Sequence, residues 1–100
     1  MILYNVTISI ESSIQQDWLQ WMKDIHIPEV MGTGYFTESK ICKLLVDDEI
    51  TYAIQYTCKN MNDLEEYQKN HAVKLQEKHS KRYIGKFSAF RTLLEVVHHH

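Results

Sequence analysis

The sequence predicts a single α+β domain with the element order βαββαβ. Residues 2–10, 39–47, 50–58 and 87–97 show the two-residue alternation or the β-branched and apolar enrichment of strands. Two intervening stretches, which begin near residues 13 and 62, repeat apolar side chains at the spacing of an amphipathic helix. The length of 100 residues suits one hydrophobic core. Two helices on one face of a four-stranded antiparallel sheet would bury all of these apolar faces.

The first strand and helix follow each other closely. Alternating apolar residues mark the strand, namely Ile2, Tyr4, Val6, Ile8 and Ile10. Ser13 and Gln16 have the spacing of a capping box, which predicts a helix start. The apolar stripe of this helix is Ile14, Trp18, Trp21, Met22 and Ile25. Pro28 disfavours the α conformation at Ile27, so we expect the regular helix to end or kink there.

The next two strands are expected to form a hairpin around the acidic turn of Asp47, Asp48 and Glu49. The strand at 50–58 alternates cleanly, whereas residues 41–46 are apolar on both faces, so their register stays open. If the turn lies near Asp47 to Glu49, Cys58 falls opposite residue 38 or 39. Cys42 is then too far along the hairpin for a disulfide, and we expect two free thiols.

The second helix is predicted to begin near Asn62, with Glu65 as its capping partner. Its stripe is Leu64, Tyr67, His71, Leu75 and His79. On the last strand, Phe90, Thr92 and Leu94 share one face. Arg91 and Glu95 share the other and are expected to pair. The complete order is that of the ferredoxin-like fold.

The second face of the sheet mixes polar and apolar groups. The adjacent pairs Leu44/Leu45 and Leu93/Leu94 make each outer strand apolar on both faces. Stacking two sheets in a homodimer would cover these leucines and enclose the polar side chains between them. The alternative is a solvated face with a few exposed leucines, which is common in monomers.

Composition excludes several classes of protein. The net charge is −2 and basic residues are dispersed, so we expect no nucleic-acid partner. No apolar run is long enough to span a membrane, and the first residues read as a strand and not as a signal peptide. With two cysteines expected to stay reduced, we infer a cytoplasmic protein. Residues 1–97 form the expected domain, and residues 98–100 look like the remnant of an expression tag.

Four segments carry a family resemblance: WLQWMKDIHIPEVMGTGYF (18–36), YAIQYTCKNM (52–61), YQKNHAVKLQEKHSKRY (67–83) and FSAFRTLLEV (87–96). They resemble an uncharacterised bacterial family of unknown function, and the pattern WxxWMxxxHIP is distinctive. That family is similar to the dimeric α/β-barrel superfamily, which includes cofactor-free monooxygenases, haem-degrading enzymes, small isomerases and effector-binding modules. The resemblance implies the ferredoxin-like fold and a homodimer, but no reaction.

His26 is the main candidate for chemistry, because it follows the tryptophan stripe and precedes Pro28. It could act as a general base or orient a ligand. Alternatively, it caps the carbonyl groups at a helix end. Trp18, Trp21, Asn5 and Gln55 are the further candidates for ligand binding.

His71 and His79 are two helical turns apart, about 12 Å, so they cannot share one ion. No zinc spacing, calcium loop or phosphate-binding glycine loop is present. We therefore expect neither a metal nor a cofactor.

These observations leave open whether the protein is an enzyme. The first hypothesis is a dimeric α/β-barrel protein that binds a small molecule near His26, with monooxygenase- or isomerase-like chemistry that needs no cofactor. The second is a non-catalytic regulatory or protein-interaction module, whose pocket would be filled by its own side chains.

Overall fold

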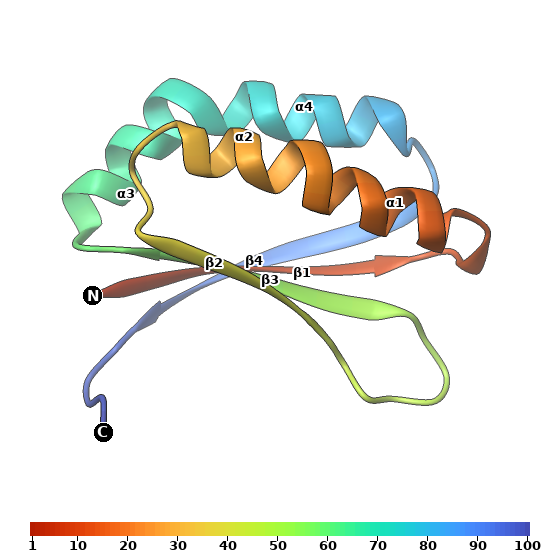
Figure 1. The fold of residues 1–100 in the computed structure, drawn as a ribbon, viewed down its shortest axis with the longest axis horizontal. Helices are drawn as coiled ribbons and strands as arrows, with labels where there is room; N and C mark the ends of the chain where they lie inside the picture. The colour runs from red at the N-terminus through yellow and green to blue at the C-terminus, as the bar shows by residue number, and fades with distance from the viewer.

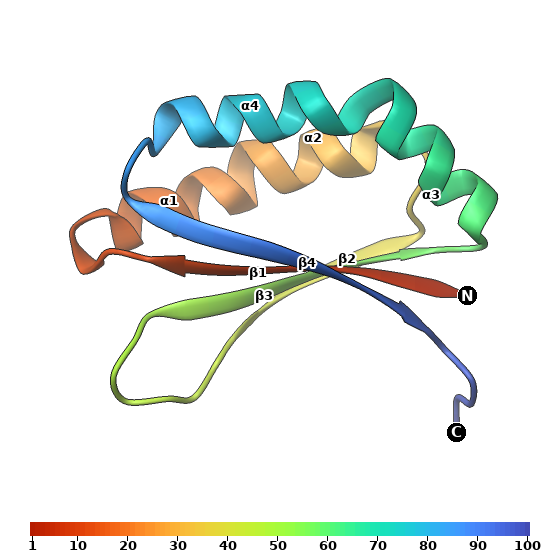
Figure 2. The same ribbon diagram turned by 180° about the vertical axis from the view of Figure 1, so that it is seen from behind.

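The computed structural model describes residues 1–100 as a four-stranded antiparallel sheet with all helices on one face (Figures 1 and 2). The strands are β1 (Ile2–Ile10), β2 (Glu38–Lys43), β3 (Thr51–Cys58) and β4 (Phe87–Glu95), in the order β2-β3-β1-β4. This arrangement confirms the predicted ferredoxin-like βαββαβ fold. No helix of the structure is long and apolar enough to cross a membrane.

The central strand β1 fixes the two faces of the sheet. It pairs with β3 so that Tyr4 lies opposite Tyr56, and with β4 so that Val6 lies opposite Arg91. As predicted, the alternating apolar residues of β1 and β3 face the helices and are buried, with Ile54 fully inaccessible. The core therefore lies between the sheet and the helices.

The first helical segment starts differently from the prediction. A 3-10 turn at Ser12–Ile14 leads into α1 (Gln15–Trp21). No side chain caps either element, so the capping box predicted from Ser13 and Gln16 is wrong. The turn is closed instead by the backbone, where the Ile14 N–H donates to the Glu11 carbonyl at 3.2 Å.

Pro28 changes the helix without ending it. Regular α-helical bonding stops at Trp21, a π-helical turn covers Met22–His26, and α2 (Ile27–Gly32) continues beyond the proline. Proline lacks the N–H that an α-helix needs and clashes with the carbonyl four residues earlier. The wider π turn, closed by the Ile27 N–H on the Met22 carbonyl, accommodates it. At the position where the sequence predicted an end or a kink of the helix, the helix therefore continues with a changed register.

The second helical segment begins one residue before the predicted start. It comprises α3 (Met61–Tyr67), a second π turn (Gln68–Ala72) and α4 (Val73–Arg82). Asn60 is the N-cap, since its Oδ1 accepts the Asp63 N–H at 2.9 Å. The cap predicted from Asn62 and Glu65 is wrong. These two residues have the same spacing as the observed capping pair, Asn60 and Asp63, but lie two positions later in the chain.

The β2–β3 hairpin is shorter than predicted. β2 ends at Lys43, so Leu44 and Leu45 belong to the connection, and Leu45 is 95% exposed. The predicted apolar outer strand at 44–46 is therefore wrong. Cys42 lies opposite Ala53, on the face away from the helices, whereas Cys58 is buried on the helix side. The two thiols lie on opposite sides of the sheet and cannot meet within one chain.

One face of the sheet has no helix over it (Figures 1 and 2). We call it the open face. Its residues on β1, β3 and β4 are Leu3, Asn5, Thr7, Ser9, Thr51, Ala53, Gln55, Thr57, Ser88, Phe90, Thr92 and Leu94. Phe90 is 63% exposed and Leu94 is 41% exposed, as expected for the mixed face described from the sequence.

Asn60→Ala is expected to destabilise the fold by about 0.5–2 kcal/mol, because the Asp63 N–H loses its capping acceptor. Asn62→Ala is the matched control, since Asn62 lies inside the helix, where alanine is favourable. Urea unfolding at one protein concentration measures both. Equal losses in the two variants would contradict the assigned cap.

Candidate functional site

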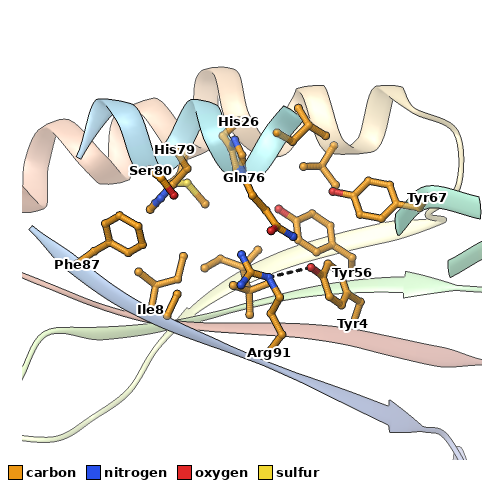
Figure 3. A pocket seen from close by; sticks show the side chains of 16 residues that line it. Tyr4, Ile8, His26, Tyr56, Tyr67, Gln76, His79, Ser80, Phe87 and Arg91 are labelled. Carbon is orange, nitrogen blue, oxygen red and sulfur yellow. Dashed lines mark hydrogen bonds between the residues drawn. The ribbon is translucent and has the colours of Figure 1, made fainter. Parts of the chain in front are cut away.

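A cavity of about 50 Å³ lies between the helices and the sheet (Figure 3). It is bounded by the first helical segment, α4, and strands β1, β3 and β4. Most of its wall is apolar. The polar or aromatic polar residues in the wall are Tyr4, His26, Tyr56, Tyr67, Gln76, His79, Ser80 and Arg91.

His26 reaches the cavity because of the π turn. In a regular α-helix, Ile25 would follow Trp21 and Met22 on the buried face. The π turn contains one extra residue, so the next position, His26, takes the buried place instead. Ile25 is accordingly 46% exposed and His26 only 9% exposed. The imidazole stacks on Trp21, with ring centres 4.9 Å apart.

The buried imidazole of His26 is held neutral at pH 7. Its pKa is lowered to about 4, mainly by burial, which outweighs the opposing charge of Glu29 and is assisted by the charges of Lys78 and Arg91. Its Nδ1 is buried and has no hydrogen-bond partner. His26 is therefore a neutral ring with an unused nitrogen, which is the state that a general base requires.

His79 comes from α4 and has a defined tautomer. Its Nε2 accepts a hydrogen bond from the Trp18 indole N–H at 2.8 Å, so the proton of the neutral ring lies on Nδ1. Burial lowers the pKa of His79 to about 4, with smaller contributions from His26 and Arg91. Phe87 packs edge-on against it at 4.4 Å. His79 can thus donate a hydrogen bond but cannot accept one at Nε2.

The two histidines face each other across the helix layer, with ring centres 5.8 Å apart. From the sequence, His71 and His79 were expected on one stripe of the second helix, and no contact of His79 with His26 was predicted. His71 instead lies 5.7 Å from Tyr35, outside the cavity wall. A ligand in the cavity would meet two neutral imidazoles, of which His79 is fixed as a donor.

The floor of the cavity contains a single cation. Arg91 projects from the helix-facing side of β4, and its Nε donates to the Tyr4 hydroxyl at 3.0 Å (Figure 3). The predicted pair with Glu95 is wrong, because no carboxylate lies within 4 Å of the guanidinium. Burial raises the pKa of Tyr56 and Tyr67 far above its usual range, so both stay neutral phenols.

Of the five candidates from the sequence, His26 alone lines the cavity. Trp18 and Trp21 lie behind the histidines, where one bonds to His79 and the other stacks on His26. Asn5 and Gln55 lie opposite each other on the open face, so they do not share a site with His26.

Sequence reasoning missed several residues of the wall, above all His79, Gln76 and Arg91. A usable signal existed for Arg91: it is a positive charge on the strand face that also carries Phe87 and Ala89. No cluster of three or more histidine, cysteine or acidic side chains is arranged to hold a metal ion.

A family model described as "Domain of unknown function (DUF4286)" matches residues 1–97. The chain belongs to this family. No curated protein matches its sequence.

Solved structures share the fold at low identity. A dimeric ferredoxin-like protein from an uncultured marine organism superposes with a TM-score of 0.73 at 12% identity, over 100% of this chain and 98% of the other. Candidate antibiotic biosynthesis monooxygenases are similar too. The one from Nitrosomonas europaea gives 0.72 at 7% identity over 98% and 100% of the chains. The one from Deinococcus radiodurans gives 0.71 at 12% over 99% and 95%. These likenesses show the fold.

The free energy of unfolding is expected to fall as the pH is lowered from 6.5 towards 4. The unfolded chain binds protons at His26 and His79 near pH 6.5, whereas the folded chain binds them only near pH 4. Stability is therefore fully present above about pH 6.5 and is lost below it, by about 2 kcal/mol per histidine down to about pH 4.5.

His26→Phe should remove about half of this pH dependence, because phenylalanine keeps the stack on Trp21 but cannot be protonated. His71→Phe is the matched control, since it leaves both cavity histidines in place. Denaturant unfolding across this pH range measures the slopes. A wild-type stability that does not change with pH would contradict the neutral, buried pair.

Proposed function

We propose that this chain forms a homodimer in which each subunit binds a small organic molecule in the cavity beside His26 and His79. In this proposal the protein is a cofactor-independent enzyme that moves a proton of its substrate. The observation that carries the proposal is the neutral histidine pair. His79 is fixed as a donor by Trp18, and His26 lines the cavity and has a buried Nδ1 without a hydrogen-bond partner.

The chemistry follows from these two states. A neutral imidazole with a low pKa is a weak base, but it is fully available at pH 7 and becomes an acid once it has taken a proton. His79 can stabilise negative charge that develops on a substrate oxygen by donating from Nδ1. Monooxygenase-like and isomerase-like reactions both begin with removal of a proton. The candidate monooxygenases with the same fold support this class of reaction by analogy only.

The open face supports the homodimer. Its rim carries Phe90 and Leu94, while Asn5 Oδ1 is buried at its centre without a partner. A second sheet stacked on this face would cover the apolar rim and could supply a donor to Asn5. The dimeric ferredoxin-like protein with the same fold supports this arrangement by analogy. We propose the cytoplasm as the compartment, where Cys42 and Cys58 would stay reduced.

A second candidate function is favoured by the size of the cavity. Ligand pockets usually have about 300–1,000 Å³, whereas this one has about 50 Å³. In a non-catalytic interaction module, the histidine pair would be part of a filled core, and the open face would be the functional surface.

Light scattering at micromolar concentration is expected to give about twice the chain mass of 11.9 kDa. Phe90→Asp should produce the monomer, since it would bury an unpaired charge between the sheets. Ile84→Asp changes another exposed apolar residue that does not belong to the open face and should leave the dimer intact. A wild-type monomer would refute the stacked-sheet arrangement.

His26→Asn tests the role of the histidine once a metabolite thermal-shift screen has supplied a ligand. If His26 is the base, turnover should drop by about 10²–10⁴-fold while the protein stays folded. His71→Asn, outside the cavity wall, should have wild-type turnover. Unchanged affinity and turnover in His26→Asn would show that the pocket is assigned wrongly. Ligand binding without turnover in the wild type would favour the non-catalytic module.

A further inference from the structure

The cavity carries one positive charge that nothing in the chain neutralises. The structure contains three side-chain ion pairs, Lys78–Glu29, Arg82–Asp17 and Lys86–Glu11. None of them includes Arg91. Every other cavity group described above is neutral at pH 7, including both histidines and the buried tyrosines. The site therefore presents a net charge of about +1 to a ligand.

The charge of Arg91 is effective across the cavity. It is one of the influences that lower the pKa of His26, His79 and Tyr67, and these groups line the upper part of the same space. An anion in the cavity would feel the same field with the opposite sign. Arg91 itself is exposed, whereas the histidines above it are buried, so the attraction is partly screened by water and salt on the open side of the cavity.

The guanidinium also has free donors. Its Nε is used by the Tyr4 hydroxyl, which is the one side-chain hydrogen bond that Arg91 makes. This bond fixes the plane of the fork, and the terminal amino groups remain available. Figure 3 shows the guanidinium pointing upward into the cavity, beneath the side chain of Gln76. Two parallel N–H donors in one plane match the two oxygens of a carboxylate.

The volume of the cavity limits the size of the ligand that it can hold. A cavity needs about 10–15 Å³ of this kind of space for each water, so about 50 Å³ holds roughly four non-hydrogen atoms. That is a carboxylate with one or two further carbon atoms. A larger ring system would require the side chains to move.

We infer that the cavity selects a compact organic acid in its carboxylate form, held by Arg91 and directed towards His26 and His79. This inference rests on the proposed function and names its substrate class. The acid's carbon chain would lie among the apolar side chains between the sheet and the helices. Neutral analogues would lack the one strong interaction that the site offers.

The test is a titration of the full chain followed by NMR at pH 7, with ionic strength held constant by sodium chloride. The probes are acetate and propionate, and the controls are acetamide and propionamide, which have the same shape without the charge. We expect the carboxylates to shift the ring C–H signals of His26 and His79 and the Nε–H signal of Arg91, with saturation. The amides should not do so.

Variants test whether the charge of Arg91 is responsible for carboxylate binding. Arg91→Gln is expected to weaken carboxylate binding about tenfold or more, and Arg91→Lys, which keeps the charge but loses the fork, should weaken it less. Arg82→Gln is the matched control, because it removes the same charge from a surface ion pair and should bind as the wild type does. The carboxylate–amide comparison needs no variant, so it stands even if Arg91→Gln does not fold.

Each contrary outcome has its own meaning. If amides and carboxylates shift the cavity signals equally, the inference of an acid is overturned and the proposed small-molecule site stands. The same holds if Arg91→Gln binds carboxylates as tightly as the wild type. If no probe shifts any cavity signal, both the inference and the proposed function are overturned.

Discussion

A proline inside the first helix sets the geometry of the candidate site. Pro28 cannot donate the hydrogen bond that its position requires, and its ring excludes a normal α-helical turn before it. The chain responds with a π turn at Met22–His26 and then continues as a helix. One extra residue turns the following positions by about 100° around the axis. That rotation places a histidine, and not Ile25, in the core beside Trp21.

A π turn also precedes the second buried histidine, His79, in the second helical segment. Its π turn at Gln68–Ala72 makes Ala72 the buried residue, and Leu75 and His79 follow on that face. The Trp18–His79 hydrogen bond then joins the two segments within the core. The Trp18 indole N–H is the donor to His79 Nε2, and this bond makes the two histidines chemically different. The pair therefore combines one imidazole with a fixed tautomer and one whose Nδ1 has no hydrogen-bond partner, although the residues are of the same type.

The strands could be predicted from the sequence because their signal is local. Alternation in β1 and β3 identifies the buried face, and the pairing of Tyr4 with Tyr56 satisfies it. His26 could be named as a candidate from its place beside the tryptophan stripe, but the rest of the site could not be predicted, because it depends on a break in helical periodicity. A pattern based on 3.6 residues per turn places Ile25 in the core and gives no sign that His26 and His79 meet. The helix starts were also misplaced, since the capping spacing of Ser13 and Asn62 occurs without a capping bond.

The cavity and the open face depend on one another through the two-residue period of the strands. On β4, Arg91 faces the cavity, while its neighbours Phe90 and Thr92 face the open side. A shift of β4 by one residue would place Phe90 in the cavity and the guanidinium on the open face. The bond from Arg91 to Tyr4 opposes such a shift, since it links β4 to the central strand on the helix-facing side of the sheet. The residue that gives the cavity its charge thus also helps to hold the apolar rim of the open face in register.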